Sequence, residues 1–338
     1  MRQKMLLGTY TRRESEGIYS LTLDTEKKEL TDLTLVTKEN SPTYLAESQK
    51  QAIYAVTSIE DQGGIAAYDK GGKFLNAVTE VGAPPCYVAV DETRQLLYGA
   101  NYHKGQVNVY RIQEDGSLIG ADIVVHTEAT GPHANQDKAH VHYTDLTPDG
   151  RLVACDLGTD GVYTYDVSKE GTLTRVALFE AIPGTGPRHL VFHPNGNYAY
   201  LFGELANTLT VLAYNAETGS FHSLQTISTI PADFTEFSGG AAIRISTDGR
   251  FVYASNRGHN SLAVFEVIEN GAHVDLIQLI STEGDHPRDF DLDPTEQFVI
   301  CANQNTDNIT LYERDMDKGT LTLLQKDIYA PECVCILF

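Results

Sequence analysis

The stretch His140-Val-His-Tyr-Thr-Asp-Leu-Thr-Pro-Asp-Gly-Arg151, followed by the apolar run 152–157, has the pattern of two β-strands joined by a tight turn. Two further segments, 161–167 and 173–179, carry apolar residues at every second position. Such alternation is typical of β-strands with one buried face, and Pro-Asp-Gly is a turn sequence. Residues 140–179 therefore predict one sheet of four antiparallel strands.

The same unit recurs along the chain. Its turn at 148–150 is repeated at 194–196, 247–249 and 294–296, with separations of 46, 53 and 47 residues. Apolar second strands are predicted over the ranges 4–11, 52–58, 96–102, 152–157, 198–205, 251–257 and 298–304. No stretch shows sustained helical periodicity. A period of about 40–50 residues with four strands in each unit is typical of a β-propeller.

The chain begins and ends at different strands of the repeated four-stranded unit. The chain begins on a second strand and ends with Glu332-Cys-Val-Cys-Ile-Leu-Phe338, which has the pattern of a first strand without its partners. We predict that this tail completes the N-terminal blade, because closing the ring removes two exposed sheet edges. The fold prediction is an all-β, seven-bladed β-propeller with four antiparallel strands per blade, in a single domain over residues 1–338.

The composition argues against several classes of partner. The 338 residues include 25 Lys and Arg against 46 Asp and Glu, so the net charge is −21. Nucleic acids and anionic membrane surfaces both attract clustered basic side chains, so neither is an expected partner. The N-terminal apolar run is too short for a signal peptide, and no window is apolar enough for a membrane helix. The five cysteines form no CxxC pair. The short N-terminal apolar run and the cysteine pattern together predict a cytoplasmic protein without a disulfide framework.

Polar side chains gather where one mouth of the predicted channel should lie. In a propeller blade the start of the first strand and the end of the second strand reach the same face, a favoured place for ligand sites. First-strand starts supply His140, His142, Arg188, His189 and Arg288, and second-strand ends supply Asp156, Glu204, Asn256 and Arg257. The opposite face carries ordinary turn residues. Three arginines at one mouth of an acidic chain indicate a small anionic ligand.

Each candidate also has a purely structural interpretation. His142 can hydrogen-bond a neighbouring blade, and the arginines can pair with Glu204, Asp156 or Asp289 to join adjacent blades. His133 and His140 lack a third ligand, so the sequence predicts neither a metal site nor a cofactor. The chain has no G-x-S-x-G motif, so no serine nucleophile is expected.

Several of these segments together resemble one known family over essentially the whole chain. They are Gly8-Thr-Tyr-Thr11, His140-Val-His142, Gly186-Pro-Arg-His189, Asn256-Arg-Gly-His-Asn-Ser-Leu-Ala-Val-Phe265 and His286-Pro-Arg-Asp-Phe290. The sequence resembles the seven-bladed-propeller lactonases, which include bacterial propeller-type 6-phosphogluconolactonases and fungal carboxy-cis,cis-muconate lactonizing enzymes.

The resemblance implies which residues take part in catalysis and which bind the substrate. The family's proposed set of one His, one Glu and two Arg matches the catalytic candidates His142, Glu204, Arg188 and Arg257. The remaining candidates are expected to bind substrate: His140, His189, Asn256, Arg288 and Asp156. The chain departs from the common pattern at Val141, Tyr143 and Gly203, which predicts a different pocket shape without loss of a functional side chain.

Three functions stay open at this point. The first is hydrolysis of a sugar lactone, 6-phosphogluconolactone, with Glu204 or His142 as general base, one Arg on the oxyanion and another on the phosphate. The second is the lactonizing cyclisation of a muconate by the same residues. The third is a non-catalytic scaffold, since propellers host many functions. A scaffold predicts an exposed apolar patch at the mouth in place of converging charges.

Overall fold

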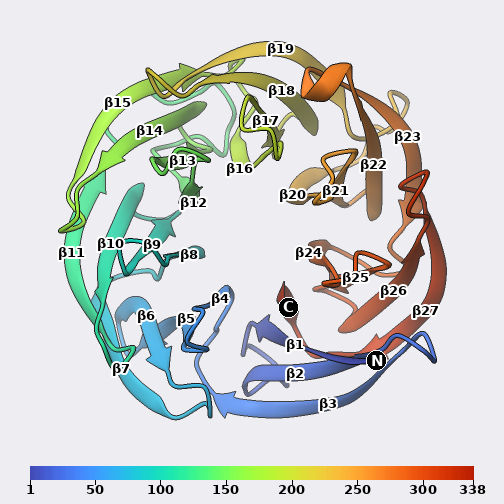
Figure 1. Ribbon diagram of the computed structural model, residues 1–338, viewed down its shortest axis with the longest axis horizontal. Helices are drawn as coiled ribbons and strands as arrows, with labels where there is room; N and C mark the ends of the chain where they lie inside the picture. Colours follow the sequence, from blue (N-terminus) through green and yellow to red (C-terminus); the bar gives the residue numbers. More distant parts are fainter.

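The computed structural model describes residues 1–338, which form a closed ring of seven four-stranded antiparallel sheets (Figure 1). From the innermost strand outward, the first three blades are β28 (Cys333–Leu337), β1 (Arg2–Thr9), β2 (Gly17–Asp24) and β3 (Glu29–Lys38); β4 (Leu45–Glu47), β5 (Ile53–Ile59), β6 (Gln62–Tyr68) and β7 (Phe74–Val81); and β8 (Tyr87–Asp91), β9 (Leu96–Asn101), β10 (Gln106–Ile112) and β11 (Leu118–Val125).

The next two blades are β12 (Val141–Leu146), β13 (Leu152–Asp156), β14 (Gly161–Val167) and β15 (Leu173–Glu180); and β16 (Pro187–Phe192), β17 (Tyr198–Gly203), β18 (Thr208–Asn215) and β19 (Ser220–Ser228). The last two are β20 (Gly239–Ile245), β21 (Phe251–Arg257), β22 (Ser261–Ile268) and β23 (His273–Ser281); and β24 (Pro287–Leu292), β25 (Phe298–Asn303), β26 (Asn308–Arg314) and β27 (Leu321–Tyr329). The propeller prediction is confirmed.

The position of a strand in its blade explains its sequence pattern. Second strands such as β9 and β25 are buried along their whole length, because the neighbouring blades cover both faces. Such strands therefore appear in the sequence as continuous apolar runs. Fourth strands such as β11 and β15 alternate between exposed and half-buried residues, since one face meets solvent. The apolar clusters accordingly lie between blades, and the largest spans β8 to β18.

The repeated turn has a common backbone conformation. Gly150, Gly196 and Gly249 have φ values of +84°, +74° and +73°, the left-handed region that favours glycine. In the first of these turns, Thr147 Oγ1 accepts a hydrogen bond from the Arg151 backbone N–H at 2.9 Å. This local chemistry accounts for the Pro-Asp-Gly signal that marks the repeat.

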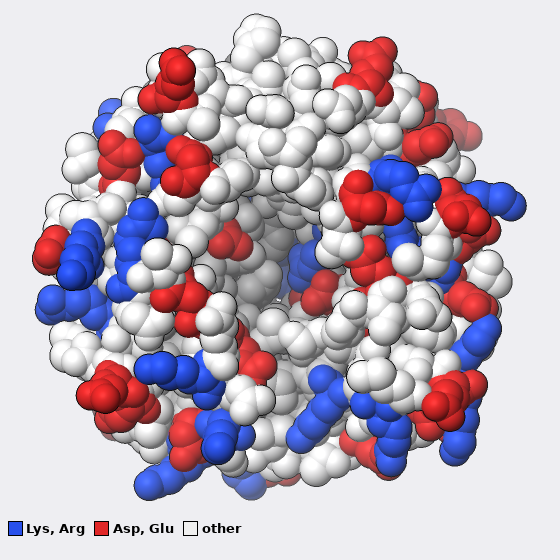
Figure 2. All heavy atoms as spheres, viewed as in Figure 1, with Lys and Arg blue, Asp and Glu red and all other residues white.

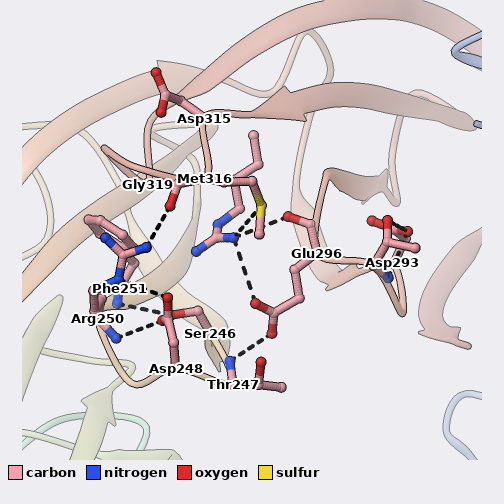
Figure 3. A network of polar contacts seen from close by, with 12 residues as sticks. Ser246, Thr247, Asp248, Arg250, Phe251, Asp293, Glu296, Asp315, Met316 and Gly319 are labelled. Carbon is pink, nitrogen blue, oxygen red and sulfur yellow. Dashed lines mark hydrogen bonds and ion pairs between the residues drawn. The ribbon is translucent and has the colours of Figure 1, made fainter.

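Arginines on the turn side of the ring join adjacent blades (Figure 3). Arg250 bonds Asp248 at 2.8 Å and the Met316 carbonyl oxygen at 2.7 Å. The Thr247 backbone N–H donates to the Glu296 carboxylate at 2.7 Å. These contacts link the β20–β23 blade to the β24–β27 blade. The blade-joining role that the sequence left open for arginine thus exists on the turn side of the ring, and at the channel mouth Arg257 also pairs with Glu204 of the preceding blade.

The ring is closed by strands from opposite ends of the chain. β28 pairs antiparallel with β1, with Leu7 opposite Ile336 and Thr9 opposite Cys333, as predicted. Both termini lie in this blade (Figure 1). The only helical element is the three-residue turn η1 (Glu269–Gly271), and no helix of the chain could cross a membrane.

Ile336→Ala tests the closing strand. Ile336 is 2% exposed and packs in the cluster between β1 and the β24–β27 blade, so its truncation should lower the free energy of unfolding by about 2–5 kcal/mol. Val125→Ala, at a 54% exposed position of β11, is the matched control and should change it by less than about 0.5 kcal/mol. Equal unfolding midpoints in urea for both variants would contradict closure by β28.

Candidate active site

A one-residue β-bulge lies near the start of several innermost strands. The pairing of each with its second strand skips the second residue of the innermost strand: His142 in β12, Arg188 in β16, Arg288 in β24 and Val334 in β28. A bulge redirects the extra side chain out of the regular alternation. All four side chains line one cavity of about 430 Å³ at the mouth of the channel.

A second set of lining residues comes from five of the seven second strands, directly after the buried small or polar residue near the end of the strand. Tyr10, Ser58, Tyr102, Glu204 and Arg257 all occupy this position, and all line the same cavity. The repeat therefore contributes two ring positions to the cavity, one from the bulges and one from the second-strand ends.

Glu204 lies between two buried arginines at the centre of the site. Its Oε2 is 3.0 Å from Arg188 Nε and its Oε1 is 2.9 Å from Arg257 Nη2. The two arginines are only 2% and 7% exposed. Arg257 also donates to the carbonyl oxygen of Gly240 at 2.7 Å, and Arg188 to that of Ala241. Both guanidinium groups are thus held in fixed orientations by the carboxylate and the backbone.

Glu204, Arg188 and Arg257 lie close enough together for their charges to shift the pKa values of Glu204 and Arg188. Burial opposes ionisation of Glu204, but Arg257 and Arg188 outweigh it and hold the pKa of this carboxyl below its ordinary value. Burial, together with Arg257, lowers the pKa of Arg188 to about 9. The carboxylate is therefore ionised and Arg188 predominantly charged at neutral pH.

Two histidines beside the arginines stay neutral. Burial, followed by the charge of Arg188, moves the pKa of His142 and that of His189 well below the usual imidazole value. The Nδ1 atom of His142 is buried and has no hydrogen-bond partner in the protein. A buried polar atom without a partner is costly, so its presence in a cavity wall marks a functional candidate.

Aromatic rings close the inner end of the cavity. Tyr87 lies 4.2 Å from Tyr44, 4.7 Å from Tyr143 and 5.2 Å from His189, measured between ring centroids. Tyr44 and His189 also line a second hollow of about 400 Å³ deeper in the channel. The space-filling view shows the hollowed centre of the ring, with a few charged side chains inside it (Figure 2). Tyr143, at which the chain departs from the common pattern of the family that it resembles, thus contributes to the floor between the two hollows.

Six of the nine predicted site residues line the cavity: His142, Arg188, His189, Glu204, Arg257 and Arg288. His140 does not. Its ring stacks on Tyr102 with centroids 4.1 Å apart, and its nitrogens bond the Tyr102 carbonyl oxygen and Asp137 at 2.9 and 2.8 Å. His140 therefore supports Tyr102, which is a lining residue.

Asp156 and Asn256 also lie outside the cavity wall, and both are fully buried. Asp156 accepts hydrogen bonds from the backbone N–H of His140 at 2.7 Å, and Asn256 donates to the Thr229 carbonyl oxygen at 2.9 Å. Side chains alternate between faces along a strand, so a shift of one residue changes what a side chain contacts. These two residues fix the loops beside the mouth, and Arg257, next to Asn256, enters the cavity.

The structure adds lining residues that the sequence did not single out, among them Tyr10, Arg12, Tyr102 and Cys86. Tyr10 and Tyr102 share the repeat position of Glu204, so the register of the second strands could have indicated them. Arg12 lies in the loop after β1 and has no such signal. Burial raises the pKa of Cys86 to about 11, which leaves a protonated thiol rather than a nucleophile at neutral pH.

The fold places the chain among the seven-bladed β-propellers, and comparison with known proteins gives its family. Residues 4–338 match the family model described as "Lactonase, 7-bladed beta-propeller", and the chain belongs to this family. It is 46% identical to the 6-phosphogluconolactonase of Bacillus subtilis (strain 168), across 98% of this chain and 97% of that protein.

Solved structures show the same relationship. A protein from Lactobacillus plantarum is 54% identical with a TM-score of 0.98, and the match covers 100% of this chain and 99% of that one. The periplasmic gluconolactonase PpgL of Pseudomonas aeruginosa is 30% identical with a TM-score of 0.93, covering 99% and 98%. The predicted family is therefore confirmed.

The buried, neutral state of His189 predicts how stability depends on pH. An unfolded chain protonates its histidine near pH 6.5, whereas the folded chain does not, so this part of the stability is complete above about pH 6.5 and is lost as the pH falls. His189→Gln should reduce the loss of unfolding free energy between pH 6 and pH 5 by about 1 kcal/mol.

Urea denaturation at a series of pH values measures this change. His222→Gln, at an exposed position of β19, is the matched control and should leave the slope as it is. The same slope for wild type and His189→Gln would contradict a neutral, buried imidazole.

Proposed function

We propose that this protein hydrolyses a sugar lactone, with 6-phosphogluconolactone as the substrate. The observation that supports this most is the group formed by Glu204, its two buried arginines and the neutral His142 in one cavity. Membership of the lactonase family and the name of the Bacillus subtilis relative support the same substrate class. A cavity lined by converging charges is also unlike the apolar patch expected of a scaffold.

In the proposed reaction a water molecule adds to the lactone carbonyl carbon while His142 accepts its proton. Protonating Glu204 would instead break its two ion pairs, whereas His142 is already neutral and lines the cavity. The oxyanion of the tetrahedral intermediate faces the guanidinium groups of Arg188 and Arg257. Fixed donors of this kind are each worth about 3–4 kcal/mol in related reactions.

Collapse of the intermediate breaks the bond between the carbonyl carbon and the ring oxygen. The proton held by His142 passes to that oxygen, which leaves as a hydroxyl group. The acid product loses its proton to solvent, and its carboxylate can bind the same two arginines. A lactone is an activated ester, so general-base help of about 10²–10⁴-fold and oxyanion stabilisation suffice without a covalent intermediate.

Variants of the central group test the proposal. His142→Ala, Glu204→Gln and Arg257→Ala should each lower kcat for freshly prepared 6-phosphogluconolactone by about 10²-fold or more, because each removes the base or an oriented donor. The assay follows acid release at constant pH, with melting curves to confirm folding and His222→Gln as a control. Hydrolysis by wild type at the spontaneous rate would contradict the proposal, and turnover of carboxymuconate in its place would favour the lactonizing reaction.

The pH dependence of the rate tests the choice of base. A base must be unprotonated to act, and the pKa of His142 lies well below the ordinary imidazole value because of burial and Arg188. The value of kcat/KM should therefore stay flat from about pH 8 to pH 6.5 and fall only at lower pH. An inflection at or above pH 6.5 that His142→Ala removes would contradict a buried, neutral base.

A further inference from the structure

Two arginines of the cavity wall have no carboxylate partner. Arg188 and Arg257 share Glu204, whereas Arg12 and Arg288 line the same cavity and form no ion pair. The chain has 46 acidic residues and a net charge of −21, so uncompensated arginines at one mouth stand out. Their charge is available to a ligand.

Both free arginines lie over one aromatic ring. The guanidinium carbon of Arg12 is 3.9 Å from the centroid of Tyr10, and that of Arg288 is 5.7 Å from it. The electron-rich face of a tyrosine attracts cations, and here it holds two like charges close together. The positive field of Arg288 also reaches the centre of the site, since it contributes to lowering the pKa of His142.

The loop that carries Arg12 is fixed by the buried carboxylate of Glu332, just before the closing strand. Its oxygens accept hydrogen bonds from the backbone N–H groups of Arg12 at 3.0 Å, Arg13 at 2.9 Å, Glu14 at 3.1 Å and Ser15 at 3.2 Å. The Glu332 side chain is 4% exposed. Four donors on one buried carboxylate define the path of the loop, so Arg12 projects from a constrained backbone.

We propose that Tyr10, Arg12 and Arg288 form the subsite for the phosphoryl group of the substrate. This assignment rests on the proposed function, which places the lactone carbonyl beside Glu204. A doubly charged phosphate compensates both arginines, and a guanidinium group matches its oxygens with two parallel donors. Arg288 is half-buried and Arg12 is exposed, so the hydrated phosphate keeps part of its water at the rim while the uncharged lactone end enters deeper.

The test compares 6-phosphogluconolactone with unphosphorylated gluconolactone. Arg12→Ala and Arg288→Ala should each lower kcat/KM for the phosphorylated lactone by about 10- to 100-fold, chiefly through KM, because charged hydrogen bonds of this kind are worth that factor. For gluconolactone, which has no phosphoryl group, the loss in kcat/KM should be at least about fivefold smaller than for the phosphorylated lactone. Arg111→Ala, which removes an exposed arginine of β10 outside the cavity, is the matched control and should change neither.

The role of Glu332 is positional and has its own readout. Glu332→Gln keeps the shape of the side chain but weakens its hold on the loop of Arg12. It should raise KM for the phosphorylated lactone several-fold and leave kcat, and both parameters for gluconolactone, near the wild-type values. Loss of kcat for both lactones would contradict positioning of Arg12 alone.

A binding measurement separates failure of the subsite from failure of the proposed function. Calorimetric titration with inorganic phosphate and with 6-phosphogluconate should give at least tenfold weaker binding to the Arg12→Ala/Arg288→Ala protein than to wild type. Wild type that binds these anions through the two arginines but hydrolyses no lactone would overturn the proposed function and leave the anion subsite standing. Equal binding by both proteins, or equal losses of kcat/KM for both lactones, would overturn the subsite.

Discussion

The pairing of β28 with β1 closes the propeller ring. Seven sheets can bury their faces against one another only in a closed ring, and closure here joins the two ends of the chain. The same junction builds part of the cavity, because Val334 of the closing strand lines it and Glu332 fixes the loop of Arg12. Stability and site assembly therefore share one set of contacts.

Within the closed ring, bulges convert a repeated scaffold into an asymmetric site. The same strand position holds His142, Arg188, Arg288 and Val334 in four different blades. The scaffold fixes where each side chain lies, and the residue at each position decides what the cavity can do. Glu204 allows two buried arginines to lie side by side, and burial together with the charge of Arg188 keeps His142 and His189 neutral.

The repeat made the fold predictable, because second strands buried on both faces and glycine turns leave strong local signals. The site was predictable where it follows the same register, as with Arg188 and Glu204. Asp156 and Asn256 were predicted to bind substrate but lie one residue before the cavity-lining position. Side chains alternate between the two faces of a strand, so both side chains are buried in the protein and do not face the cavity. Arg12 gave no signal, since its loop is held by a residue 320 positions away.

A crystal structure of the chain with 6-phosphogluconate, the product of the proposed reaction, would show which arginines hold the carboxylate and which hold the phosphate. We expect the carboxylate of the ligand within hydrogen-bond distance of Arg188 and Arg257, and its phosphate between Arg12 and Arg288. A ligand bound in the deeper hollow beyond Tyr44 and His189, or with its carboxylate outside the reach of both buried arginines, would contradict the proposed roles of these residues.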